Sequence, residues 1–236
     1  MSAEVPLPKQ QTQTYPEPQY FVEDPGVTDV IFLVEEKEIH LTKVILVRSS
    51  PVFRAMFTSD FKEKNESTIT FPKKKYEDFV RFLRSFYPGE HLELDVSVIE
   101  RILPLAREYG MDALMKSFHD WLLVAVESQN KDILFKLKCF YLAAVYNFEE
   151  LYNRMLENLK SVKIDTYKKE PTFKLIPPEG RAELFEKHCE FLETKFSNFR
   201  KKMSDVKYNI DNLEVVCENC HKYTCISKED KECIWR

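Results

Sequence analysis

Glycine is scarce in this chain of 236 residues, which has only Gly26, Gly89, Gly110 and Gly180. Nucleotide-binding loops need clustered glycines, because their backbone approaches a phosphate closely. No two of these glycines lie close together in the sequence, which excludes a Walker loop and a dinucleotide fingerprint. The patterns G-x-S-x-G and H-E-x-x-H are absent as well. We therefore expect a protein that is not an enzyme.

Two histidines stand next to a residue of catalytic type: His119 precedes Asp120, and His188 precedes Cys189. Adjacent residues on a helix point about 100° apart. We therefore expect that the two side chains of each pair do not face each other and that both histidines are structural.

The sequence also lacks the signals of membrane and nucleic-acid proteins. It has no run of about 18 apolar residues, as a membrane-spanning helix would need. Its first residues do not show the basic stretch followed by an apolar stretch that is typical of a secretory signal. The formal net charge is -4, and the longest basic run, Lys73 to Lys75, is followed at once by Tyr76-Glu77-Asp78. We expect a protein of the cytoplasm, the nucleus or both, with no membrane or nucleic-acid partner.

The order of predicted elements indicates an α+β fold. Residues 1–25 contain five prolines and few apolar side chains, which favours a flexible arm. Residues 29–34 are β-branched and aromatic, as in a buried strand, and 39–41 and 67–71 predict two more strands. Later segments show helical periodicity, with Thr42, Ser50 and Ser97 as N-caps and Pro104 as a kink or break. Strands before helices are typical of the α+β class.

Several spaced motifs in residues 29–123 resemble the BTB/POZ domain. Residues 43–53 are similar to its central signature, in which a lysine and aliphatic residues lead into Ser-Pro-x-Phe. Phe86-Tyr87-x-Gly89 and the stretch Leu103 to Tyr109 resemble its later helices. One departure is Thr42, where the family usually has histidine.

The resemblance implies a domain order. We expect a BTB/POZ domain at 26–125, formed by a small sheet and a helical cluster. Residues 126–165 are similar to the helical pair, of the 3-box or BACK type, that often follows this domain in cullin adaptors. A long helix at 178–215 and a cysteine-rich tail at 216–236 complete the chain.

BTB domains usually form homodimers, and the resemblance places the interface around residues 43–48. The sequence agrees in one respect, because Val44, Ile45 and Val47 give a very short helix apolar residues on several faces. We predict that they form the dimer interface. The alternative is that the whole helix is buried within one protomer.

Members of the family that recruit the third type of cullin carry a hydrophobic-x-Glu motif after the second helix. Phe61-Lys62-Glu63 occupies that position here, and Phe57 precedes it. The resemblance thus implies a substrate adaptor of a ubiquitin ligase, with Phe57, Phe61 and Glu63 on the cullin. The alternative is a dimeric scaffold or transcriptional cofactor without cullin. No kelch-like repeat indicates the substrate.

The long helix has a heptad pattern, since its apolar residues recur at spacings of four and three. This pattern predicts a coiled coil that reinforces the dimer, or else an amphipathic helix that folds back on the upstream helices. The residues are Phe185, Cys189, Leu192, Phe196, Phe199, Met203, Val206, Ile210 and Leu213.

Four of the six cysteines lie in the last 20 residues: Cys217, Cys220, Cys225 and Cys233. The C-x-x-C spacing allows two thiolates to bind one tetrahedral Zn²⁺. Cys225 and Cys233 would complete the ligand set, or His221 would replace one of them. The alternative is that the tail carries free thiols, and no other cofactor is expected.

Overall fold

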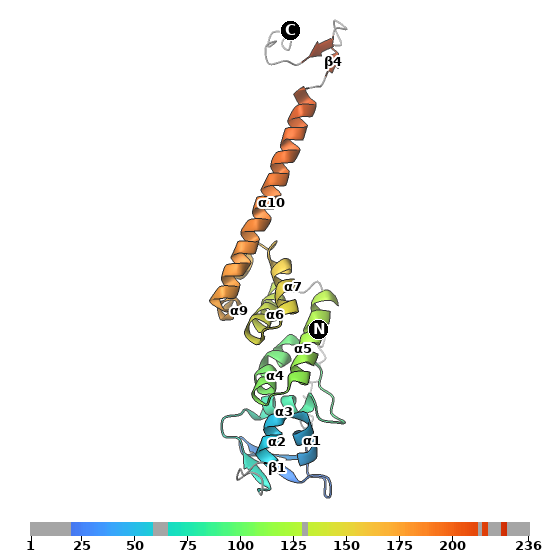
Figure 1. Ribbon diagram of the computed structural model, residues 1–236, viewed down its shortest axis with the longest axis vertical. Helices are drawn as coiled ribbons and strands as arrows, with labels where there is room; N and C mark the ends of the chain where they lie inside the picture. Colours follow the sequence, from blue (N-terminus) through green and yellow to red (C-terminus); the bar gives the residue numbers. More distant parts are fainter. Residues whose placement is uncertain (1–19, 59–65, 129–131, 212–213, 217–222, 226–236) are drawn as a thin grey trace, which may run out of the picture. The chain divides into compact units, whose positions relative to one another are not determined.

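The computed structural model describes residues 20–58, 66–128, 132–211, 214–216 and 223–225, and Figure 1 labels its elements. The chain forms two compact units, residues 1–121 and 122–236. The division falls within a helix, α5 (Asp112–Ser128). Each unit has its own buried apolar core.

A three-stranded sheet belongs to the first unit. Its central strand, β1 (Val30–Val34), pairs antiparallel with β2 (Lys37–Leu41) and parallel with β3 (Thr68–Thr70). Alternate residues of β1 are fully buried and the other two are half-buried. An apolar strand at the centre of a sheet is expected to be covered in this way.

Aromatic side chains fill the core between this sheet and the helices. The ring of Phe32 on β1 lies 4.7 Å from that of Phe71 and 6.1 Å from that of Phe79, measured between centroids. Tyr109 stacks on Phe53 at 4.4 Å. Each such pair adds about 0.5–1.5 kcal/mol beyond the area that it buries. The aromatic cluster therefore joins the sheet to the helices of this unit.

The first helix, α1 (Lys43–Ser49), is capped by a residue other than the predicted one. The Thr42 hydroxyl donates to the carbonyl of Val27 at 2.9 Å, so it does not cap the helix. The carboxylate of Asp29 accepts from the Lys43 amide at 2.6 Å instead. Asp29 is 14 residues away, and only the folded chain brings it to this helix end.

The cap of α4 (Val96–Glu108) also differs from the prediction, because Asp95 accepts from the amides of Ser97 and Val98. Pro104 lies inside α4, which continues through it as one helix. The prediction for α2 (Pro51–Thr58) is confirmed, since the Ser50 hydroxyl accepts from the Phe53 amide at 3.1 Å. Helix α3 (Tyr76–Arg84) completes the unit.

The second unit is built mainly of helices. The predicted pair is present as α6 (Ile133–Tyr146) and α7 (Glu149–Leu159). Two short helices follow that the sequence did not predict, α8 (Ile164–Tyr167) and α9 (Pro171–Leu175). Elements of about one turn are too short to show a periodic pattern. The long helix is α10 (Pro178–Asp211), orange to red in Figure 1.

A hairpin lies at the boundary predicted between the long helix and the cysteine-rich tail, because the helix ends at Asp211 and not at residue 215, and Glu214 and Val215 belong to a strand. Its strands, β4 (Glu214–Val216) and β5 (Tyr223–Cys225), pair antiparallel and were not predicted. With a small sheet first and helices after it, the α+β class predicted from the sequence is confirmed. None of the helices in the described stretches combines the length and apolar character that a membrane crossing needs.

Candidate interaction surfaces

Helix α1 has one apolar face in the core and another toward solvent. Leu46 is fully buried, Ile45 and Val47 are half-buried, and Val44 is 58% exposed. The helix is therefore not buried whole within its own chain. A second apolar surface against Val44 would cover what the fold leaves open.

The segment before β1 lies beside this helix and the edge strand β2. The His40 amide on β2 donates to the carbonyl of Phe21 at 2.9 Å, and the Phe21 ring meets that of Tyr87 edge-on. Val22 and Val27 of this segment are each 55% exposed. The bond between Thr42 and the Val27 carbonyl puts one of these valines next to the start of α1. Exposed apolar residues thus occur both on the segment before β1 and on α1.

The predicted cullin site divides between described and undescribed residues. Phe57 on α2 is only 8% exposed, with the Phe32 ring 6.4 Å away and the Lys43 ammonium 5.4 Å from its own ring. Phe57 is therefore a core residue, and a contact with cullin would fall mainly on Phe61 and Glu63. These two lie outside the described residues, so their role stays a prediction.

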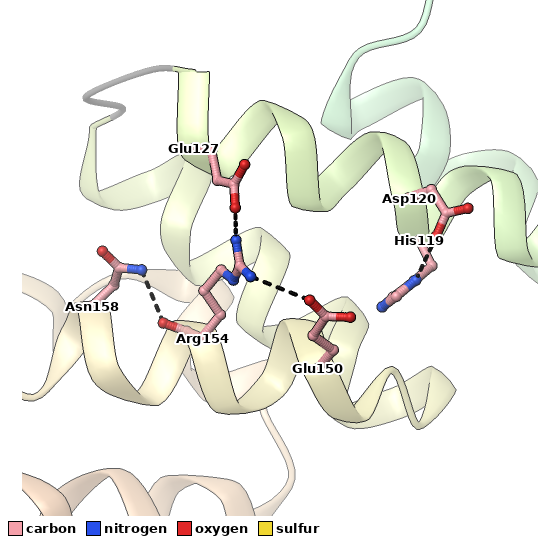
Figure 2. A network of polar contacts seen from close by, with 6 residues as sticks. All are labelled: His119, Asp120, Glu127, Glu150, Arg154 and Asn158. Atoms are coloured by element: carbon pink, nitrogen blue, oxygen red, sulfur yellow. Dashed lines mark hydrogen bonds and ion pairs between the residues drawn. The ribbon is translucent and has the colours of Figure 1, made fainter.

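The helical pair is tied to the end of α5 by charge. Arg154 on α7 pairs with the carboxylate of Glu127 on α5 and, at 3.2 Å, with Glu150 one turn earlier on α7 (Figure 2). The Asn158 amide donates to the Arg154 carbonyl at 2.9 Å. Both carboxylates are mostly exposed, and exposed ion pairs contribute about 0–1 kcal/mol each. The network therefore connects α5 and α7 and adds little to stability.

The expectation for the adjacent histidine pairs was wrong at one of the two. His119 Nδ1 lies 3.1 Å from Asp120 Oδ1, as Figure 2 shows. The side chains bend toward each other although their Cα–Cβ bonds diverge, since the Asp120 side chain is exposed and free to turn. His188 instead contacts the Lys160 carbonyl at 2.7 Å and is buried, whereas Cys189 is exposed.

The described residues hold no group of three or more His, Cys, Asp or Glu side chains arranged to bind a metal. Of the predicted zinc ligands, Cys217, Cys220 and Cys233 lie outside the described residues. Cys225 ends β5, and the register sets it opposite Glu214. The zinc site therefore stays a prediction.

The two halves of α10 fit the two alternatives drawn from its heptad pattern. Its first turns fold back on the second unit, where Leu184 is fully buried and the Phe185 ring meets that of Phe173 at 5.9 Å. From Leu192 to Met203 the apolar residues are exposed. The side chains after Met203 are outside the description, and the coiled coil stays a prediction.

Comparison with known families matches residues 21–125 to the BTB/POZ domain. Among curated proteins, the chain is 28% identical over 135 residues to the BTB and MATH domain-containing protein 36 of Caenorhabditis elegans, which is 57% of this chain and 40% of that protein. It is 31% identical over 96 residues to the Armadillo BTB Arabidopsis protein 1 of Arabidopsis thaliana, 41% of this chain and 13% of that protein.

A third relative is the Kelch-like ECH-associated protein 1A of Danio rerio. The match is 26% identical over 184 residues, 78% of this chain and 26% of that protein. The chain therefore spans less than half the length of each of these three relatives. The shared part includes the sheet, α1, α2 and the aromatic core described above.

Proposed function

Since residues 21–125 are a BTB/POZ domain, a protein-interaction module, we propose that this chain is a dimeric adaptor of a cullin-based ubiquitin ligase. One face would bind cullin and another would hold the protein to be ubiquitinated, so catalysis would belong to the partners. The exposure of Val44 on a short helix with one buried face is the observation that carries the dimer. The kelch-like relatives support the cullin partner.

The cullin contact is proposed at Phe61 and Glu63. Helix α2 ends at Thr58 and β3 begins at Thr68, so both residues belong to the connection after the second helix. An aromatic side chain there would enter a pocket on cullin, and the carboxylate at its rim would fix the orientation. A dimeric scaffold without cullin is the competing function, and it does not require these two residues.

Binding of the purified chain to the N-terminal domain of the third cullin tests the adaptor function. We expect binding that weakens at least tenfold in Phe61→Ala/Glu63→Ala. The matched control is Leu175→Ala/Glu179→Ala, which truncates an exposed apolar and an acidic residue of the second unit. A folded wild-type chain that does not bind would leave the scaffold as the function.

The dimer is tested separately by sedimentation equilibrium. Val44→Asp would place two carboxylates in the proposed interface, and we expect the dimer dissociation constant to rise at least tenfold. Val124→Asp is the control, because Val124 is 63% exposed on α5. A monomeric wild type, or a Val44→Asp dimer of unchanged affinity, would contradict the proposed interface.

A further inference from the structure

The second half of α10 carries an uncovered row of apolar side chains, the α10 stripe, formed by Leu192, Phe196, Phe199 and Met203. Their exposed fractions are 49%, 57%, 59% and 53%. Spacings of four, three and four residues put them on one face of the helix. With a rise of 1.5 Å per residue, the stripe is about 17 Å long. Four large apolar residues in one row suit a partner helix.

In the first half of the same helix, by contrast, the corresponding side chains are buried. Leu184 is fully buried, His188 is 8% exposed, and the His188 ring contacts the Lys160 carbonyl. These residues pack on the body of the second unit, to which α7 and α9 belong. The stripe begins about one turn after His188, where the described neighbours no longer cover the helix. Its exposure is therefore not a property of α10 as a whole.

Basic residues border the stripe. Over the span of the stripe, residues 192–203, the sequence has one acid, Glu193, and four cations, which gives a formal charge of +3; the cations are Lys195, Arg200, Lys201 and Lys202. On a helix of 100° per residue, Lys195 and Lys202 fall on one flank of the stripe, whereas Arg200 shares the other flank with Glu193. Lys195 and Lys202 line a hollow of about 530 Å³ together with Leu192, Phe196, Asn198 and Phe199.

The charges argue against a second copy of this chain as the occupant. Pairing the stripe with itself would bring two segments of formal charge +3 together. Like charges on the flanks of paired helices are destabilising, whereas opposite charges select the partner. We propose that the α10 stripe binds an amphipathic helix of another protein, with apolar residues at its centre and carboxylates along the edge that meets Lys195 and Lys202. The inference does not rest on the proposed cullin function.

Two designed helical peptides of about three heptads test this inference. Both carry leucine at the seam positions, one with glutamate and the other with lysine at the flanking positions. Binding to the full chain is measured by fluorescence anisotropy. We expect the glutamate peptide to bind at least tenfold more tightly than the lysine peptide. Raising the salt from about 0.05 M to about 0.5 M should weaken it on the order of tenfold, because the flanking charges are exposed.

Charge reversal gives a sharper result than loss of binding. In Lys195→Glu/Arg200→Glu/Lys202→Glu we expect the preference to invert, so that the lysine peptide binds more tightly. The control makes the same charge change at exposed lysines of the second unit, off the stripe, in Lys163→Glu/Lys169→Glu/Lys174→Glu. It should keep the wild-type preference. Phe196→Ala/Phe199→Ala should weaken binding of the glutamate peptide at least tenfold.

Three results would overturn the inference. Equal binding of both peptides would mean that the stripe is merely apolar and selects no charge. Failure of the wild type to bind either peptide would mean that no helix docks there. Self-association that increases with salt and disappears in Phe196→Ala/Phe199→Ala would identify a second copy as the occupant, since salt screens the repulsion that opposes it.

Discussion

Tyr167 on α8 is fully buried, and its hydroxyl has no hydrogen-bond partner among the described residues. The hydroxyl therefore lost its water on folding without replacing it. A buried polar group left unpaired costs about 1–3 kcal/mol. The Tyr167 ring packs on that of Phe173, with 5.2 Å between their centroids, so the ring itself contributes to the core.

Removing this hydroxyl should stabilise the protein. We predict that Tyr167→Phe raises the free energy of unfolding by about 1 kcal/mol, because the phenylalanine ring keeps the packing and loses only the unpaired group. Urea unfolding followed by circular dichroism measures the change. A lower free energy of unfolding in the variant would show that the hydroxyl has a partner in solution.

Tyr109 makes the stability depend on pH in alkaline solution. Burial, and then the charge of Glu108, raise the pKa of Tyr109 above its usual value of about 10. Since the folded-state pKa is the higher one, this group's contribution is complete below about pH 10 and is lost as the pH rises further. We predict that Tyr109→Phe loses stability less steeply with pH above 10, by up to about 1.4 kcal/mol per pH unit.

Urea unfolding of both proteins at several pH values between about 8 and 11 measures this difference. Tyr152 keeps its raised pKa in both proteins, so its share of the pH dependence cancels. Parallel curves would show that Tyr109 ionises in the folded state as it does in the unfolded chain.

At the scale of elements, the C-x-x-C pair of the tail carries the zinc prediction. We predict about one zinc ion per purified chain, lost in Cys217→Ser/Cys220→Ser, because C-x-x-C supplies the chelating pair. Metal content measures this. A zinc-free wild type would leave free thiols in the tail.

In both α1 and α10, periodicity alone does not distinguish an apolar residue that contacts the core from one that contacts a partner. In α1 the structure divides them, with Leu46 buried and Val44 exposed. In α10 it divides them along the helix, with Leu184 covered and Phe199 open.

For the whole molecule, the division into two units predicts two unfolding transitions. Each unit has its own core, Phe79 in the first and Leu151 in the second, both fully buried. We predict that Phe79→Ala lowers the free energy of unfolding of the first unit alone, by about 3–5 kcal/mol. We predict that Leu151→Ala lowers that of the second unit alone, by about 2–5 kcal/mol.

Scanning calorimetry, with intrinsic fluorescence as a second probe, separates the two transitions. A single transition that both variants shift equally would show that the units unfold together.

The sequence by itself determined the α+β class, the order of the elements and the BTB/POZ resemblance, because these depend on local periodicity and spaced motifs. Three strands, the helical pair and the long helix were predicted within a few residues of their bounds. The short helices α8 and α9 and the tail hairpin were not predicted, since one turn or three residues carry no period.

Only the tertiary structure decided which side chains are available. Asp29 caps α1 across 14 residues, Phe57 enters the aromatic core, and after His188 the helix α10 is no longer covered by described neighbours, so that Phe196 and Phe199 are exposed. Each depends on contacts between residues distant in the sequence. A pattern along one segment records that a side chain is apolar or charged, and burial depends on what the rest of the chain brings against it.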